Sequence, residues 1–188
     1  MTLIKSISGI RGTIGGKPLE NLTPLDVVKF TAAYATWMME NSDEDDFTVV
    51  LGRDARVSGQ MLASIVASTF QGMGINVIDL GLATTPTVEL AIVHLHANGG
   101  IILTASHNPA QWNALKLLNE SGEFLSDVDG RKILELAEND DYTFISYDNN
   151  DEKHSLDFMI TYFCMFLILI YKTLGMMKTL HSDTYIEG

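Results

Sequence analysis

Short apolar runs alternate with amphipathic stretches along the first 138 residues. The apolar runs have the length and the β-branched content of buried strands, and they cover Phe47–Leu51, Ile75–Leu80, Ile101–Leu103 and Leu115–Leu118. Apolar positions at helical spacing lie between them and after them, in the stretches that begin at Pro24, Gln60, Thr85 and Ser126. This alternation predicts an α/β fold with a layered β-sheet and helices on both faces. The connection between the third and fourth strands is too short for a crossover, so these two strands are expected to be antiparallel and the sheet mixed.

Several helix ends carry recognisable capping residues. Thr23 is the expected N-cap of the first helix, with Pro24 at its first position and Asp26 in its first turn, where the positive end of the helix dipole lies. Ser58 is the expected N-cap of the helix from Gln60 to Gln71. The third helix is expected to run from Thr85 to Ala97 and to close at Asn98-Gly99-Gly100 with a left-handed cap.

Thr104–Pro109, a polar segment with the sequence Thr-Ala-Ser-His-Asn-Pro, follows the third apolar run. It precedes the fourth run, so the pattern reads as strand, loop, strand, with the hydroxyl of Ser106 held at the end of a buried strand. Such loops carry the chemistry of many α/β sheets. A serine hydrolase would need a Gly-x-Ser-x-Gly elbow, which the sequence lacks. Transfer of a phosphoryl group instead needs cations around the phosphate, and Lys116 and Arg11 are available.

Two further polar segments contain arginine among small residues. Ser8–Gly16 contains Arg11 and four glycines, which predicts a tight turn, either an ordinary glycine-rich one or one that approaches a ligand closely. Gly52–Gly59 follows a predicted strand and precedes a helix. In that loop Arg53 and Asp54 form either an internal ion pair or a direct ligand contact, and the sequence leaves both readings open.

The three polar segments together resemble the α-D-phosphohexomutases, the family of phosphoglucosamine mutases, phosphomannomutases and phosphoglucomutases. Residues 104–109 with Asn113 and Lys116 resemble the family's phosphoserine loop, although Ala114 stands where the family usually has glycine. The resemblance covers residues 1–138 and implies the first domain of the mutase fold. It also implies an isomerase that interconverts hexose 6-phosphate and hexose 1-phosphate by intramolecular phosphotransfer in carbohydrate metabolism. Hexose and hexosamine mono- and bisphosphates would be its substrates.

The resemblance also implies roles for particular residues. Ser106 would carry the phosphate and provide a ligand to Mg²⁺, whose carboxylate ligands in the family come from an Asp-Gly-Asp-x-Asp-Arg loop that this sequence lacks. The catalytic set would be Ser106, His107, Lys116 and Arg11. The substrate-binding set would be Arg11, Arg53, Asn108 and Asn113.

Composition narrows the class of partner. The formal net charge is −12 and the pI is near 4.6, which argues against nucleic acid or an anionic membrane surface as the main partner. A single cysteine, Cys164, excludes an intrachain disulfide and is typical of a reducing compartment. The N-terminus lacks the apolar run of a signal peptide, so we expect the cytoplasm.

The pattern changes after residue 138. Residues 139–155 are polar and acidic, which is typical of a linker, and residues 156–188 contain an apolar run about as long as a buried helix. This tail has three readings: a membrane anchor, a packing helix, or a non-native sequence produced by truncation or frameshift. We favour the third, because the resemblance ends where a second domain is expected. The alternative to an active mutase is therefore a catalytically inactive fragment that keeps the phosphoserine domain.

Overall fold

A computed structural model describes residues 1–6 and 9–146 of the 188-residue chain. The chain divides into two units, Met1–Asp151 and Glu152–Gly188, and every described residue belongs to the first. The predicted tail at 156–188 and most of the predicted linker lie outside the described residues. In chain order the elements are β1 (Ile4–Ser6), β2 (Gly9–Thr13), α1 (Pro24–Glu40), β3 (Thr48–Arg53), α2 (Gly59–Gly72), β4 (Asn76–Leu82), α3 (Thr85–His94), β5 (Gly99–Leu103), β6 (Trp112–Leu118) and α4 (Asp127–Asn139).

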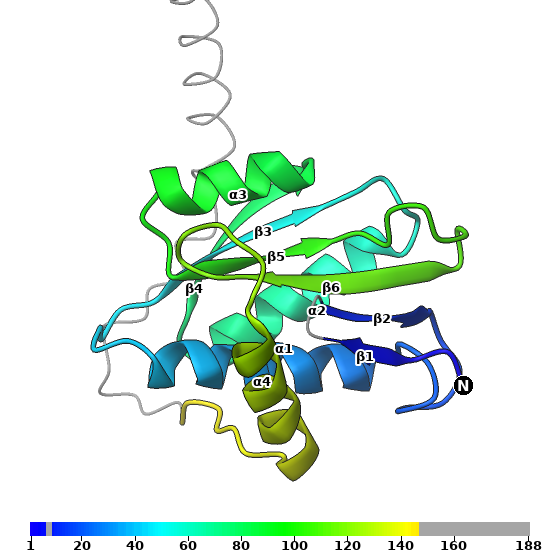
Figure 1. The fold of residues 1–188 in the computed structure, drawn as a ribbon, viewed down its shortest axis with the longest axis horizontal. Helices are drawn as coiled ribbons and strands as arrows, with labels where there is room; N and C mark the ends of the chain where they lie inside the picture. Colours follow the sequence, from blue (N-terminus) through cyan, green and yellow to red (C-terminus); the bar gives the residue numbers. More distant parts are fainter. Residues whose placement is uncertain (7–8, 147–188) are drawn as a thin grey trace, which may run out of the picture. The chain divides into compact units, whose positions relative to one another are not determined.

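The strands form one six-stranded sheet with the order β1-β2-β6-β5-β3-β4 (Figure 1). β3 pairs in parallel with β4 and with β5, whereas β5–β6, β6–β2 and β2–β1 are antiparallel. Parallel neighbours need a crossover, which α2 and α3 supply, and antiparallel neighbours accept a short return. The predicted mixed α/β sheet is therefore confirmed.

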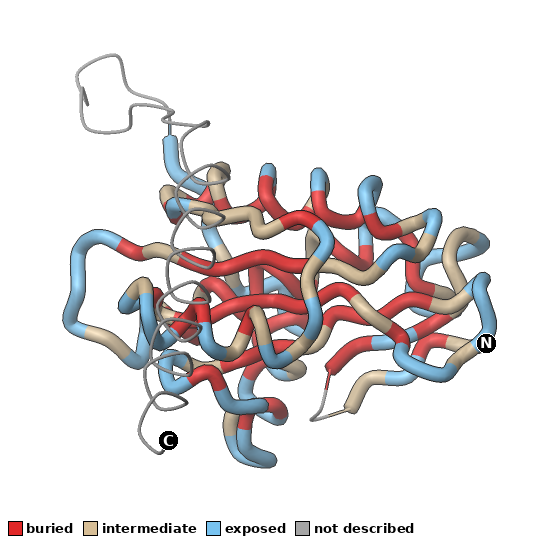
Figure 2. Tube along the Cα trace, turned by 90° about the horizontal axis from the view of Figure 1, so that it is seen from above, coloured by how far each residue is buried: buried red, intermediate tan, exposed pale blue. Residues whose placement is uncertain are grey.

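Helices lie on both faces of the sheet (Figure 1). α3 packs on β3 and β5 from one side, and α1, α2 and α4 lie on the other. β3 and β5 are buried along almost their whole length between these layers (Figure 2), which explains why their sequences are apolar without alternation. In the part of the chain that the structure describes, no helix has both the length and the apolar character needed to cross a bilayer.

The start of α1 follows the sequence prediction. Thr23 Oγ1 accepts a hydrogen bond from the backbone N–H of Asp26 at 3.4 Å, and Asp26 Oδ2 accepts one from the backbone N–H of Thr23 at 3.0 Å. This reciprocal capping box satisfies donors that the helix cannot pair internally. The predicted N-cap and first-turn aspartate are therefore confirmed.

Two other helix ends differ from the prediction. Ser58 occupies the predicted N-cap position of α2, but its side chain makes no capping hydrogen bond. Its Oγ accepts from Asn113 Nδ2 at 2.9 Å. α3 ends at His94, and the left-handed residue is His96, with φ of 51°. Gly99 and Gly100 do not cap the helix, since they begin β5.

The predicted glycine-rich turn at Ser8–Gly16 is also wrong over most of its length. Gly9–Thr13 forms β2, which pairs with β1 on one side and β6 on the other. Gly9 has a φ of 125°, and a Cβ built there would overlap the carbonyl oxygen of Leu115. A glycine thus lets β2 approach β6 closely, and the turn itself is confined to the residues after β2, where Gly15 and Gly16 have positive φ.

Candidate active site

A hollow of about 240 Å³ lies over β2 and β6. Arg11 is opposite Ala114 in the β2–β6 register, and Lys116 is opposite Ile102 in the β6–β5 register. Opposed residues and residues two apart in a strand share a face of the sheet, so all four lie on one face. α3 covers that face over β3 and β5, and the hollow occupies the neighbouring part over β2 and β6.

The serine loop, residues 104–111 between β5 and β6, forms one wall of the hollow. Ser106 is exposed and has a φ of 51°, a left-handed conformation that non-glycine residues seldom adopt. Its backbone N–H donates to Thr104 Oγ1 at 3.2 Å, and the N–H of Asn108 donates to the carbonyl of Ala105 at 3.0 Å. The loop therefore projects Ser106 outward on a short, internally hydrogen-bonded turn.

Two cations line the hollow beside the serine. Arg11 projects from β2 and Lys116 from β6, and Lys116 Nζ lies 5.6 Å from the centre of the Phe124 ring. The aromatic face attracts the ammonium group and so favours a position of Lys116 in the hollow. No carboxylate is among the described residues that line this site. In a chain of net charge −12, the hollow is therefore locally cationic and suited to an anionic group.

The predicted site residues fall into two groups. Arg11, Ser106, His107, Asn108 and Lys116 all line the hollow.

Arg53 and Asn113 are not among the lining residues and serve other contacts. Arg53 Nη2 donates to Gln60 Oε1 at 2.8 Å on α2. Asn113 has no exposed surface, and its Nδ2 donates to Ser58 Oγ.

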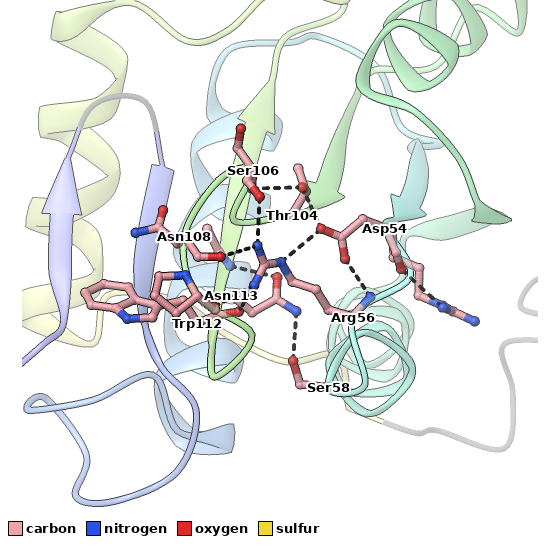
Figure 3. A network of polar contacts seen from close by, with 11 residues as sticks. Asp54, Arg56, Ser58, Thr104, Ser106, Asn108, Trp112 and Asn113 are labelled. Carbon is pink, nitrogen blue, oxygen red and sulfur yellow. Dashed lines mark hydrogen bonds and ion pairs between the residues drawn. The ribbon is translucent and has the colours of Figure 1, made fainter.

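Arg56 is a residue that the sequence analysis did not single out, and it forms the densest polar cluster beside the serine loop (Figure 3). Its Nε lies 3.1 Å from Asp54 Oδ2, so the ion pair of this loop joins Asp54 to Arg56 and not to Arg53. Asp54 Oδ2 also accepts from Thr104 Oγ1 at 2.7 Å. The spacing Asp54-x-Arg56 in a loop at the end of a strand was the available signal. It did not show that the arginine reaches across to another loop.

The described residues do not make a magnesium site. Mg²⁺ takes oxygen ligands in an octahedral arrangement, with carboxylates as the usual protein donors. Residues 1–6 and 9–146 contain no group of three His, Cys, Asp or Glu side chains placed to hold a metal ion, and the lining of the hollow offers hydroxyl and amide oxygens without a carboxylate. The family uses Mg²⁺. Ser106 could provide one oxygen to such an ion, and we derive no step of the chemistry through it.

The fold and the hollow together define an α/β domain that presents a serine beside two cations. Residues 3–144 match the family model described as phosphoglucomutase/phosphomannomutase, alpha/beta/alpha domain I. The chain belongs to this family of phosphohexomutase isomerases, of which it holds the first domain.

Individual relatives agree with this assignment. A phosphoglucomutase/phosphomannomutase of Thermococcus kodakarensis is 35% identical over 153 residues, which is 80% of this chain and 33% of the relative. A phosphoglucosamine mutase of Alkaliphilus metalliredigens is 40% identical over 119 residues, 63% of this chain and 25% of the relative. A solved Thermus thermophilus structure described as a phosphomannomutase superposes with a TM-score of 0.64 at 29% identity, covering 73% of this chain and 30% of that one. The chain thus spans a third or less of the length of these relatives.

Proposed function

We propose that this chain acts as the phosphoserine domain of a phosphohexomutase, in which Ser106 carries the phosphate that is exchanged with a hexose or hexosamine phosphate. The observation that supports this proposal is the composition of the hollow. It combines an exposed serine on a left-handed turn with Arg11 and Lys116 and has no carboxylate among its described lining residues. A phosphoserine is an anion, and a cationic hollow free of carboxylates favours it electrostatically.

The proposed reaction exchanges one phosphoryl group in each direction. A hydroxyl oxygen of the hexose monophosphate attacks the phosphorus of phosphorylated Ser106, the bond from phosphorus to Oγ breaks, and Oγ takes up the proton that the sugar hydroxyl releases. The resulting bisphosphate turns over in the site and returns its other phosphate to Ser106. Arg11 and Lys116 would neutralise the transferring group and assist proton movement at the sugar hydroxyl, and His107 would orient the site.

Arg11 and Asn108 also line the hollow and are proposed as sugar-phosphate contacts. Arg53 and Asn113 remain predictions of substrate binding that the family resemblance implies. The positions they occupy, against Gln60 and Ser58, favour a role in shaping the loops around the hollow. The cytoplasm remains the compartment we propose.

A second candidate function is a catalytically inactive domain that retains the phosphoserine fold. The size of the hollow favours it: about 240 Å³ is below the roughly 300–1,000 Å³ of complete ligand pockets. Phosphoryl transfer depends on positioning and on neutralised charge, and the described residues supply one wall of a site without a metal cage. We therefore expect phosphate exchange at Ser106 without ordinary mutase turnover from this chain alone.

The test is to incubate the purified chain with a hexose 1,6-bisphosphate and Mg²⁺ and to follow its intact mass, with peptide mapping to locate the label. We expect the mass of one phosphoryl group on Ser106 and none on the variant Ser106→Ala. Ser64→Ala is the matched control, because Ser64 is an exposed serine on α2 whose Oγ donates to the carbonyl of Gln60. Its label should equal that of the wild type.

A coupled assay with a hexose 1-phosphate separates the two candidate functions. Label on Ser106 with no steady turnover supports the domain as proposed, and turnover at ordinary mutase rates removes the inactive alternative. Label on another residue while Ser106 stays bare contradicts the proposal.

A further inference from the structure

Arg56 uses every N–H of its guanidinium group within the protein. Nε pairs with Asp54 Oδ2 at 3.1 Å. Nη1 donates to the carbonyls of Pro109 at 2.8 Å and Trp112 at 3.0 Å, and Nη2 donates to those of Ser106 and Asn108, both at 2.8 Å. A guanidinium group has no further donor. Arg56 thus has no N–H left for a substrate phosphate.

The four carbonyls belong to the serine loop and to the first residue of β6, which places their oxygens around a single cation (Figure 3). Carbonyl dipoles that point toward one another repel, and a central cation removes that cost. The Arg56 side chain is 12% exposed, and its bonds to the carbonyls of Ser106 and Pro109 lie at the exposed surface of the loop. The path of the loop from Ser106 to Trp112 therefore depends on one side chain that comes from the β3–α2 loop.

The backbone N–H and carbonyl of Ser106 are each connected to the Asp54 carboxylate through one intermediate side chain. The carbonyl of Ser106 accepts from Arg56, which is paired with Asp54. The N–H of Ser106 donates to Thr104 Oγ1, whose hydroxyl donates to Asp54 Oδ2. Ser106 has a φ of 51°, and a non-glycine residue persists in this region when its surroundings hold it there. The hydrogen bonds that connect both backbone groups of Ser106 to Asp54 are such a constraint.

We infer that Arg56 is a positioning residue: it sets the conformation of the serine loop and, through it, the place of the Ser106 hydroxyl. The part of this inference that concerns catalysis rests on the proposed function, and the part that concerns the loop does not. Arg56 acts on Ser106 through the backbone and does not contact the phosphate. A lysine in its place keeps the positive charge but has one nitrogen with three donors, too few for four carbonyls and a carboxylate.

The test compares Arg56→Lys with Arg53→Lys in the full chain. Arg53 is the matched control, because it lies three positions earlier, at the end of β3, and its guanidinium group donates to Asp54 O and Gln60 Oε1 and not to the serine loop. Amide hydrogen exchange of the peptide covering residues 104–112 is measured first. We expect exchange at least about tenfold faster in Arg56→Lys, equivalent to about 1.4 kcal/mol, and unchanged exchange in Arg53→Lys. Exchange elsewhere in β3 and β5 reports whether the variant is folded.

The second readout is the rate at which a hexose 1,6-bisphosphate phosphorylates Ser106. Misplacement of a reacting group by about 1 Å costs on the order of 100-fold in rate, so we expect a loss of that size in Arg56→Lys even though the charge is kept. Arg131→Lys, an exposed arginine on α4, controls for the substitution itself. Unchanged loop exchange in folded Arg56→Lys would overturn the inference, as would a wild-type rate of phosphorylation.

The two measurements, hydrogen exchange and phosphorylation rate, test the inference and the proposed function separately. If the wild-type chain takes no phosphate on Ser106, the proposed function fails, and the exchange of residues 104–112 still decides whether Arg56 holds the loop. If the wild type is phosphorylated and the variant behaves like it in both readouts, the function stands and the positioning role is wrong.

Discussion

At each end of the antiparallel pair β5–β6, one side chain from another element makes hydrogen bonds to the backbone of the pair or of its connecting loop. We call the Tyr34 bonds the buried tie and the Arg56 bonds the exposed tie. At the open end, the Tyr34 hydroxyl of α1 donates to the carbonyl of Leu118 at 2.7 Å and accepts from the N–H of Gly100 at 2.9 Å. At the loop end, Arg56 donates to the carbonyls of the serine loop and of Trp112. Both side chains satisfy backbone groups, but they do so in different surroundings.

The surroundings decide what each tie contributes. Tyr34 has no exposed surface and contacts the rings of Trp37 and Phe70 at centroid distances of 5.9 and 6.0 Å. Loss of its bonds would leave polar groups unpaired in the core, which lowers the stability of the whole domain. Arg56 lies near the surface, where water can replace lost hydrogen bonds, so its removal should change local geometry more than global stability. The buried tie thus supports the fold, and the exposed tie supports the site.

Gly99→Ala, at the Tyr34 end of β5, should cause the largest fall in the free energy of unfolding. A Cβ at Gly99 would lie 2.9 Å from the carbonyl oxygen of Leu118, and it would overlap the Tyr34 hydroxyl, its nearest neighbour. The ring cannot retreat within the packed core, so overpacking adds to the loss of the Tyr34 bonds. We expect the free energy of unfolding to fall by about 3 kcal/mol, measured by urea denaturation.

Gly72→Ala is the matched control for this substitution. Gly72 is at the end of α2, and the nearest neighbour of its added Cβ is Phe144 Cδ1 at 3.2 Å, on a side chain that is 43% exposed and free to shift. Alanine is the better helix former, so Gly72→Ala should be neutral or slightly stabilising. Equal stability of the two variants would show that the Tyr34 end is not tightly packed.

Tyr34→Phe should have the next largest effect. It keeps the ring and removes the hydroxyl, which leaves the buried N–H of Gly100 and the carbonyl of Leu118 without this partner. We expect a loss of about 2 kcal/mol in the free energy of unfolding, with unchanged hydrogen exchange in the serine loop. Tyr142→Phe removes an exposed hydroxyl that donates to Asp140 and should cost less than about 1 kcal/mol. Faster exchange in the serine loop of Tyr34→Phe would contradict the separation of the two ends.

The sequence predicted best those features that depend on nearby residues. The capping box of Thr23 and Asp26 spans three positions, and the buried strands follow from local apolar runs. The serine loop was found because one contiguous segment carries its pattern, and in the structure Ser106, Arg11 and Lys116 line one hollow.

Features that depend on contacts between distant segments were missed. Arg53 and Arg56 lie three positions apart, and nothing local shows that Arg56 crosses to residues 106–112. Ser58 is at the N-cap position of α2 as predicted, but the partner of its side chain is Asn113, 55 residues away. The run Gly9–Thr13 reads as a turn by its glycines and becomes a strand because β1 and β6 flank it. Pairing across the fold overrides local preference in each case.

The smallest effect is a dependence on alkaline pH that distinguishes the buried tie from the exposed one. Burial raises the pKa of Tyr34, and the hydrogen bond with Gly100 offsets this only in part. The unfolded chain loses the Tyr34 proton near the ordinary tyrosine value of about 10, while the folded chain keeps it. Above about pH 10 the unfolded state therefore binds fewer protons, and the free energy of unfolding falls by up to about 1.4 kcal/mol per pH unit from this group.

Urea denaturation of the wild type and of Tyr34→Phe between about pH 8 and pH 11 isolates this contribution. Other groups titrate alike in both proteins, so their effects cancel in the difference. The stability advantage of the wild type should be constant up to about pH 9 and should shrink by about 1.4 kcal/mol at about pH 11. An advantage that stays constant to pH 11 would mean that Tyr34 ionises as readily in the folded chain as in the unfolded one, and the buried tie would then be open to water like the exposed tie at the serine loop.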